Sequence, residues 1–148
     1  GYLGHHWEEV QHRSGQPFDR TLLDRHGWLY DTEPACRAVV VMRELAPHET
    51  FRFFQRLQRA FYAEGRPVWD PDAYGGLVEG FNVDPSEFLD AFGSQDAIKA
   101  TWQDFSLARS WGINGFPTIV LRKGSTGQII ASGYTTAGDM EHTIAALT

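Results

Sequence analysis

Hydrophobic residues in the first three quarters of the chain recur every three or four positions, as they do on one face of an amphipathic helix. The first such stretch has Leu3, Trp7 and Val10 on one side and ends before Gly15. The same spacing predicts helices in six segments, at about residues 2–14, 33–46, 47–64, 72–81, 85–92 and 94–111.

Three of these helices begin with the same signal. Asp31, Asp70 and Asp84 each supply a carboxylate that can accept from free backbone N–H groups, and each is followed within three residues by a proline. Glu87 is placed to complete a capping box with Asp84. We therefore assign these acidic residues to helix capping rather than to catalysis.

Three apolar groups are expected to form core. One is a helical stripe of Phe51, Phe54, Leu57 and Phe61, with Phe53 and Ala60 on its flank. The helix at 94–111 has two apolar sides, which predicts packing between two layers; these sides are Ile98, Trp102, Phe105 and Ala108, and Leu107 with Trp111. The third is an irregular patch of Leu22, Leu23, Trp28, Leu29 and Tyr30.

After residue 116 the period changes to that of strands. Residues 118–122 and 128–132, with a turn at 124–127, predict a β-hairpin, and residues 137–147 predict a closing helix. The run 118–121 is almost continuously apolar, as in strands that are covered on both faces and paired on both edges. A two-stranded hairpin is marginal alone, so we expect a further strand to pair with it.

Composition argues against several partners. The chain has 148 residues, enough for one domain or for one plus a small subdomain, and a formal net charge of −6. An acidic chain is a poor match for nucleic acid or an anionic membrane, and no segment approaches the roughly 20 apolar residues that cross a bilayer. Arg52, Arg56 and Arg59 form one stripe, which predicts a solvated helix face.

Other candidate sites are weak. His5, Glu9 and His12 share a helix face, but no His-Glu-x-x-His motif accompanies them, so a solvated polar face is favoured and no metal is expected. Cys36 is the only cysteine, which excludes an internal disulfide. Its apolar neighbours disfavour a thiolate, so we expect it to be buried and inert.

The segment with the clearest chemistry is 111–121 (WGINGFPTIVL), which ends the long helix and enters the strand through Pro117. Proline can begin a strand but not continue one, and X-Pro bonds are where a cis peptide is accessible, so we expect Phe116–Pro117 to be cis. Residues 115–118 (GFPT) resemble the cis-proline loop of DsbA-like thiol-disulfide oxidoreductases. Segments 14–18, 31–38 and 59–66 resemble the FrnE-like, cytoplasmic branch of that family.

The resemblance covers essentially the whole chain and implies an α/β, thioredoxin-like (DsbA-like) fold with an inserted all-helical subdomain. The helical subdomain would be residues 1–93, the bridging helix 94–112, and the C-terminal half of the thioredoxin-like domain 113–148. Substrate binding would fall on Phe116, Pro117 and Thr118. The backbone of Phe116 would hold the substrate, while Pro117 would pack against the active-site sulfurs.

The family's Cys-x-x-Cys motif has no counterpart here, so the sequence identifies no catalytic residue and the chain alone should lack dithiol activity. We expect the family's N-terminal βαβ segment to be absent from this chain. The segment is either lost or left out, or its place is taken by a second copy of the chain. In the last case two chains would pair through their open sheet edges as a homodimer.

The activity implied by the resemblance is thiol-disulfide exchange with protein or small-molecule thiols and disulfides, in the cytoplasm and without a cofactor. Two alternatives stay open. A glutathione-dependent isomerase of the kappa-class transferase type shares the fold, binds glutathione at the loop, and uses a serine in place of the two cysteines. A non-catalytic binding domain would use a degenerate fold and its open sheet edge.

Overall fold

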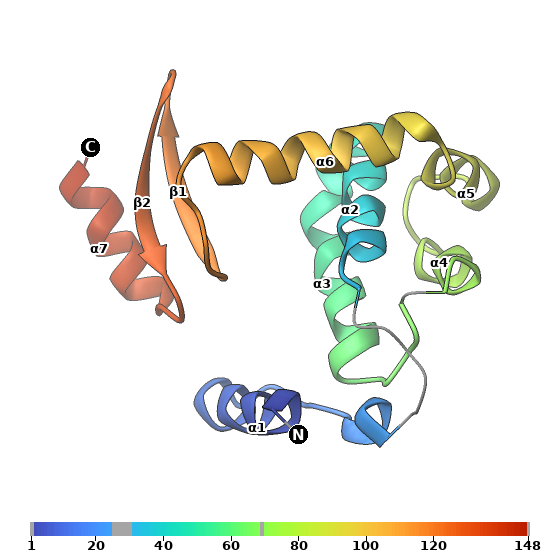
Figure 1. The fold of residues 1–148 in the computed structure, drawn as a ribbon, viewed down its shortest axis with the longest axis horizontal. Helices are drawn as coiled ribbons and strands as arrows, with labels where there is room; N and C mark the ends of the chain where they lie inside the picture. Colours follow the sequence, from blue (N-terminus) through green and yellow to red (C-terminus); the bar gives the residue numbers. More distant parts are fainter. Residues whose placement is uncertain (1, 25–30, 69, 148) are drawn as a thin grey trace. The chain divides into compact units, whose positions relative to one another are not determined.

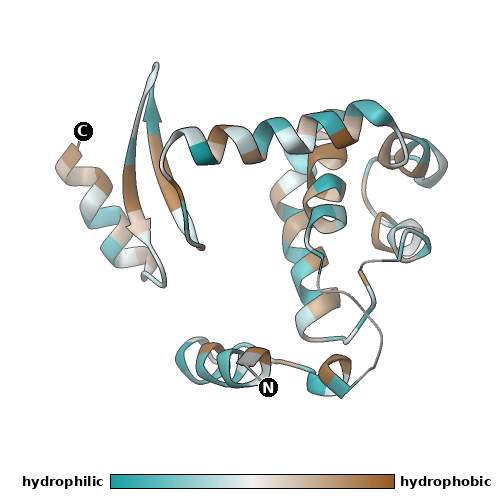
Figure 2. Cartoon of the chain, viewed as in Figure 1, coloured by the Kyte–Doolittle hydropathy of each residue, from teal (hydrophilic) through white to brown (hydrophobic). Residues whose placement is uncertain are grey.

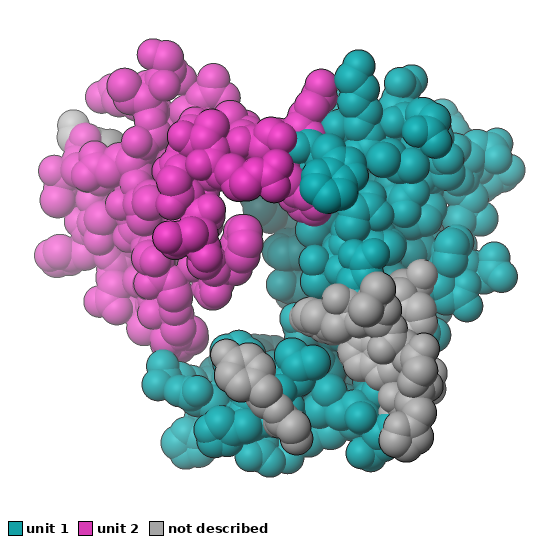
Figure 3. Space-filling view, viewed as in Figure 1, with its two compact units in different colours: residues 1–102 teal, residues 103–148 magenta. Residues whose placement is uncertain are grey.

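The computed structural model describes residues 2–24, 31–68 and 70–147. The chain divides into two compact units, unit 1 at residues 1–102 and unit 2 at residues 103–148, which Figure 3 shows in different colours. The boundary falls inside the long helix that the sequence predicted, so this helix contributes residues to both units.

Unit 1 is built of helices (Figure 1). In chain order they are α1 (Tyr2–Ser14), the 3₁₀ helix η1 (Arg20–Asp24), α2 (Glu33–Leu45), the 3₁₀ helix η2 (Pro47–Glu49), α3 (Thr50–Tyr62), α4 (Asp72–Leu77), α5 (Pro85–Phe92) and the first half of α6 (Gln95–Ser110). Each of the six segments predicted to be helical contains one of these α-helices. The segment expected to start at Pro47 does so as a 3₁₀ turn that leads into α3.

The core of unit 1 lies where α2 packs against α3 and α5. Met42, Phe53 and Phe88 are fully buried there, and the ring centres of Phe53 and Phe88 are 5.7 Å apart. Figure 2 shows hydrophobic residues along α2 and α3. Burying a side chain of this size is worth about 1.5–3 kcal/mol, so each of these residues contributes substantially to the stability of the unit.

The buried face of α3 differs from the predicted one. The helix buries Phe53, Leu57, Ala60 and Phe61. Phe51 is instead 88% exposed and Phe54 is 43% exposed, so the expectation that both belong to the core is wrong. Phe53 starts a series at i, i+4, i+7 and i+8 that forms one continuous stripe, and Phe51 and Phe54 lie to one side of it.

The two-sided packing predicted for α6 is confirmed only in part, because Ile98, Phe105 and Ala108 are half-buried whereas Trp102, Leu107 and Trp111 are exposed. The buried residues of this helix are small, Ala97 and Thr101, and the Thr101 hydroxyl donates to the Ala97 carbonyl at 2.8 Å. Trp102 is 51% exposed and Leu107 is 48% exposed. The close-packed side of α6 is therefore the one that carries the short side chains.

Within unit 1, helix α1 packs against the end of α3 through Trp7, which is 2% exposed. Its ring centre lies 5.6 Å from that of Phe61 and 5.3 Å from that of Tyr62, both at the end of α3. Leu22, in η1, is fully buried, as expected of the irregular apolar patch. Three other members of that patch lie outside the described residues: Trp28, Leu29 and Tyr30.

All three acidic start signals accept backbone N–H groups at a helix start, but only Asp84 is the N-cap residue of its helix; Asp31 and Asp70 each lie one residue before the N-cap. Asp84 Oδ1 accepts from the backbone N–H groups of Ser86 at 2.8 Å and Glu87 at 3.0 Å. Asp31 and Asp70 each accept from the N–H group two residues further on, at 2.9 and 3.1 Å. Capping thus accounts for these carboxylates.

Unit 2 contains the second half of α6, strands β1 (Thr118–Lys123) and β2 (Thr126–Ser132), and α7 (Ala137–Leu147), which packs against β2. The hairpin is confirmed, but its turn is shorter than predicted because β2 already begins at Thr126. Gly124 has a φ of 63°, which suits the first central position of a two-residue type II′ turn.

Strand β1 is less covered than its apolar run predicted. Within the described residues the sheet consists of β1 and β2 alone, so one edge of β1 has no partner strand there. Ala131 is buried, but Ile119 is 41% exposed and Ile129 is 48% exposed. The pairing register shifts by one residue between Ile119 and Val120, which makes Ile130 the extra residue of a β-bulge.

Candidate substrate-docking site

The loop between α6 and β1 starts from a well-defined helix end. The Gly112 N–H donates to the Arg109 carbonyl at 2.9 Å, and the Ile113 N–H donates to the Ala108 carbonyl at 3.1 Å. Gly112 has a φ of 73°. These two bonds and the left-handed glycine form a Schellman motif, which ends the helix and turns the chain toward β1.

The other end of the loop is tied to the hairpin. Phe116–Pro117 is a cis peptide bond, as the sequence predicted. The Thr118 hydroxyl donates to the Gly115 carbonyl at 2.7 Å, and the Gly133 N–H donates to the Pro117 carbonyl at 2.8 Å. The loop is therefore held by side-chain and backbone hydrogen bonds on both sides of the proline.

Phe116 is the open point of this loop. Its side chain is 83% exposed. Within the described part of the chain, neither its N–H nor its carbonyl takes part in a hydrogen bond. A free donor and a free acceptor on one exposed residue are what an extended peptide needs in order to add to a backbone by β-type pairing.

The predicted site residues thus lie together, but with different accessibility. Phe116 and Pro117 are exposed, and Thr118 is half-buried at the start of β1. Cys36 belongs to unit 1, within α2, and is half-buried rather than buried as expected. It also takes part in an interaction within the structure.

Sequence reasoning missed Tyr134, which follows Gly133 directly. Its side chain is 61% exposed. The Gly133–Pro117 hydrogen bond brings the chain before Tyr134 next to the chain after Phe116. The available signal was an aromatic residue between β2 and α7 within a run that has no charged side chain.

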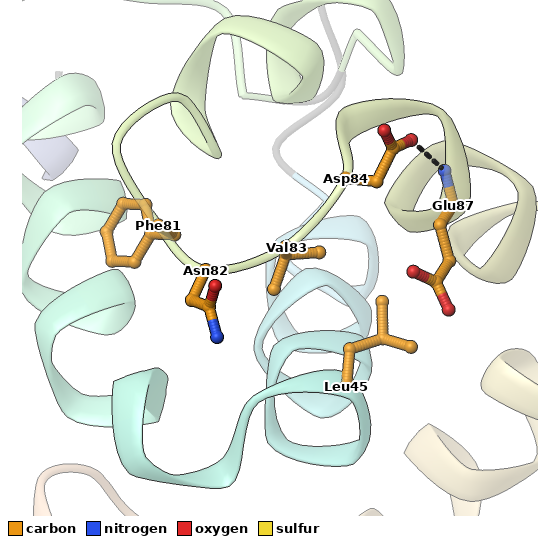
Figure 4. Close-up of a pocket in the computed structure, with 6 residues that line it drawn as sticks. All are labelled: Leu45, Phe81, Asn82, Val83, Asp84 and Glu87. Atoms are coloured by element: carbon orange, nitrogen blue, oxygen red, sulfur yellow. Dashed lines mark hydrogen bonds between the residues drawn. The ribbon is translucent and has the colours of Figure 1, made fainter.

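A hollow of about 380 Å³ lies in unit 1, between the end of α2 and the loop before α5 (Figure 4). Its lining residues are Leu45, Phe81, Asn82, Val83, Asp84 and Glu87. The Asp84 carboxylate is engaged in capping α5, and none of the lining residues is a cysteine, serine or histidine. We assign no thiol chemistry to this hollow.

The histidine face of α1 is a surface of ion pairs. Glu9 contacts Arg13 at 2.7 Å, and His5 lies 4.0 Å from Glu8. Among the residues that the structure describes, no three His, Cys, Asp or Glu side chains are grouped so that they could hold a metal ion. No helix within the described ranges is long and apolar enough to cross a membrane.

Tyr74 has a clearly perturbed side chain, but it belongs to the core. It is fully buried, and its hydroxyl donates to the Val68 carbonyl. Burial raises the pKa of Tyr74 above its usual range, and the nearby charge of Arg37 opposes this rise. Its role is packing.

No protein-family profile and no curated protein matches the chain. Solved structures do match it. A structure described as "a putative protein disulfide isomerase from Nitrosomonas europaea" has 33% sequence identity and a TM-score of 0.93, covering 98% of this chain and 71% of that one. The chain belongs to this family of thiol-disulfide oxidoreductases.

Two structures of one further relative agree with this assignment. The cytosolic disulfide reductase DsbM from Pseudomonas aeruginosa has 27% identity and a TM-score of 0.80, with 99% of this chain and 73% of that chain covered. A structure of DsbM with GSH has 27% identity and a TM-score of 0.76, covering 99% and 75%. The likeness supports the DsbA-like architecture indicated by the sequence, here seen as a helical unit and a unit with a two-stranded sheet.

Proposed function

We propose that this chain is the substrate-docking part of a DsbA-like dithiol-disulfide oxidoreductase of the FrnE-like branch. The observation that carries the proposal is the open backbone of Phe116, on a loop fixed by hydrogen bonds on both sides. Membership of the oxidoreductase family supports the reaction class.

In the proposed reaction, a thiolate of a reduced dithiol attacks one sulfur of the substrate disulfide. A mixed disulfide forms, and the other substrate sulfur leaves as a thiolate. The second thiolate of the pair then attacks the mixed disulfide and releases the first substrate sulfur. The substrate gains two electrons, and the dithiol becomes a disulfide.

The residues of this chain would position the substrate for that exchange. An extended segment beside the substrate cysteine would pair with the N–H and carbonyl of Phe116, while Pro117 would lie against the sulfurs. Cys36 is the only cysteine of the 148 residues, so a Cys-x-x-Cys pair would have to come from other polypeptide. The chain alone is expected to show no insulin reduction.

Docking can be tested on the chain itself by NMR. We would titrate the isotope-labelled chain with a short extended peptide that contains S-methylcysteine, which cannot form a disulfide. We expect the amide signals of Phe116 and Thr118 to move and the hydrogen exchange of Phe116 to slow. Gly124, in the turn at the other end of β1, is the internal control and should not respond. Amide shifts at Gly124 or in unit 1, with none at Phe116, would reject the docking role.

A second candidate function is a reaction that uses glutathione, because the structure of the relative DsbM was solved with GSH. A glutathione-dependent isomerase of the kappa-class type would bind that tripeptide at the same loop. A titration with S-methylglutathione separates the isomerase from the oxidoreductase. If the chain belongs to an isomerase, S-methylglutathione should bind more tightly than the peptide. A non-catalytic binding domain would instead bind the peptide, while full-length protein would fail to reduce insulin.

Location and assembly are proposals of the same kind. We propose a cytoplasmic protein, because the DsbM relative is described as cytosolic. We also propose that the edge of β1 without a partner strand accepts another strand, from further polypeptide or from a second copy. Sedimentation of the chain would separate these two sources, because a monomer excludes the second copy.

A further inference from the structure

We infer that unit 1 carries a docking site for a basic segment of another protein, on α4, α5 and the loop between them. A lysine or arginine side chain of that partner would lie in the hollow shown in Figure 4. The site shares no residue with the loop at Phe116 and is independent of the proposed thiol-disulfide exchange.

The negative charge of the chain is concentrated in one stretch. Residues 67–98 contain seven of its 19 acidic residues and none of its 13 lysines and arginines or its six histidines. The rest of the chain is close to neutral, with 12 acidic residues against 13 lysines and arginines. The stretch includes α4 and α5, which pack against each other, and the first residues of α6. A surface of one sign attracts partners of the opposite sign.

The carboxylates of this stretch are exposed and have no cation beside them. Within the described residues none of the seven forms an ion pair. Elsewhere in unit 1, Glu9, Glu33 and Glu49 each pair with an arginine three or four residues further on. Helix capping explains a carboxylate such as Asp84, but it does not explain why 32 consecutive residues hold no basic side chain. The seven are Asp70, Asp72, Glu79, Asp84, Glu87, Asp90 and Asp96.

The hollow of about 380 Å³ suits a side chain that is apolar along its length and charged at its end. Leu45 and Val83 are half-buried against the core and give the hollow apolar walls. Asp84 and Glu87 supply carboxylates, and Figure 4 shows the Glu87 carboxylate extending from α5 toward the side chain of Leu45. Lysine and arginine combine these two properties, because an apolar stem carries their cationic end.

The two carboxylates of the hollow are available to a partner. Asp84 uses only Oδ1 for its two capping hydrogen bonds, which leaves Oδ2 without a partner in the described part of the chain. Arg52 lies beside the hollow, with its guanidinium carbon 4.1 Å from the centre of the Phe81 ring, but it pairs with Glu49 at 2.7 Å. Arg52 therefore neutralises neither Asp84 nor Glu87.

The test is an NMR titration of the isotope-labelled 148-residue chain with tetralysine at low salt and about pH 6, where amines and carboxylates are both charged. The amide signals of Asn82, Val83 and Glu87 should move, and those of Phe116 and Gly124 should not. Binding should weaken severalfold in about 0.3 M NaCl, because salt screens exposed charges.

Two further peptides separate the charge of the partner from its stem. Tetralysine with acetylated side chains keeps the stems without the charge and should not bind. A tetrapeptide of 2,4-diaminobutyric acid keeps the charge, but its stems are two methylene groups shorter. Because the apolar walls of the hollow would then lose contact with the stem, we expect it to bind about fivefold more weakly than tetralysine.

A matched pair of variants separates the site from the overall charge. Glu87→Gln removes one carboxylate of the hollow, keeps the shape of the side chain, and should weaken tetralysine binding about threefold. Glu141→Gln makes the same change of net charge on α7, in unit 2, and should leave binding as it is in the native chain. Both side chains are exposed, so neither change should alter the urea unfolding of the chain.

Each other result overturns the docking site. Equal weakening by Glu87→Gln and Glu141→Gln would mean that only net charge acts. Equal binding of the acetylated or the short-stem peptide would mean that the hollow does not hold a long cationic side chain. If Ca²⁺ at the same concentration of charge moves the Asn82 and Glu87 amides as strongly as tetralysine, the region binds cations in general and is no protein-docking surface. Silence of these amides rejects the site directly, and none of these results bears on the loop at Phe116.

Discussion

The ion pair between Glu33 and Arg37 gives a sharp test of how unit 1 is held together. Arg37 Nη2 donates to Glu33 Oε2 at 3.1 Å, and Nη1 donates to the carbonyl of Phe92, at the end of α5, at 3.2 Å. The side chains of Arg37 and Glu33 are 15% and 20% exposed. The guanidinium carbon also lies 4.4 Å from the centre of the Phe92 ring. Arg37 therefore links α2 to α5.

Replacing Arg37 alone should be costly. Arg37→Met leaves the Glu33 carboxylate without its ion-pair partner at a position that little water reaches. It also removes the guanidinium N–H that donates to the Phe92 carbonyl. Removing one member of a buried pair costs about 3–5 kcal/mol, and the remaining exposure of these side chains places the expected loss near 3 kcal/mol.

Replacing both partners should cost much less. Glu33 Oε1 and Arg37 Nε are already buried without a hydrogen-bond partner among the described residues, so the pair does not recover its full desolvation cost. The double variant Glu33→Leu/Arg37→Met removes both charges and both unsatisfied atoms. We expect it to lose less than about 1 kcal/mol relative to the native chain.

The free energy of unfolding of the native chain, of Arg37→Met and of the double variant can be measured by urea unfolding, followed by far-ultraviolet circular dichroism. Arg13→Met is the matched control, because Glu9 and Arg13 form a pair with the same helical spacing but are 49% and 59% exposed. That exposed pair should contribute no more than about 0.5 kcal/mol. If the double variant is as unstable as Arg37→Met, or less stable, the loss comes from packing and the electrostatic reasoning is refuted.

Three further changes test other parts of unit 1. Trp7→Ala should cost about 4 kcal/mol by thermal or urea unfolding, because it empties the site that docks α1. Gly65→Ala should cost about 2 kcal/mol, because φ is 59° and a Cβ atom would lie 2.8 Å from Asp19 Oδ2. Burial raises the pKa of Tyr74, so the unfolded state deprotonates first and stability should fall as the pH rises above about 10. Tyr74→Phe should reduce that alkaline loss, although it also removes the bond to Val68.

Each of these has its own control. Trp102→Ala removes an indole that is 51% exposed and should cost clearly less than Trp7→Ala. Gly15→Ala shares the positive φ, at 68°, but meets no atom within 4 Å, so it isolates the backbone contribution. An alkaline stability slope that is the same in Tyr74→Phe and in the native chain would mean that other groups cause it.

The features that the sequence predicted well depend on local signals. Asp84 and Pro85 fix the start of α5 because a carboxylate and a proline act within one helical turn. The helix end at Gly112 and the turn at Gly124 follow from the same kind of short-range geometry. The loop at Phe116 and Pro117 belongs to this class, which is why its position follows from the amino-acid sequence alone.

The features that the sequence predicted poorly depend on which neighbour a helix face meets. Phe53 and Phe54 are adjacent and chemically identical, yet Phe53 is fully buried and Phe54 is 43% exposed. Hydrophobicity cannot distinguish them, because either can continue a helical stripe with Leu57 or Phe61. Only the placement of α2 and α5 against α3 decides between the two stripes.

The proposed docking site combines both kinds of signal, and this explains why only part of its surroundings was predicted. Phe116 follows from the proline beside it. The neighbour of the loop depends on pairing across the hairpin, where counting back from the turn at Gly124 would have placed Ser132 opposite Pro117. The single extra residue at Ile130 changes that outcome, and the Gly133 N–H donates to the Pro117 carbonyl instead. The link between the loop and the end of β2 is therefore set by a bulge several residues away, and a hairpin without the bulge would not bring the Gly133 N–H to the Pro117 carbonyl.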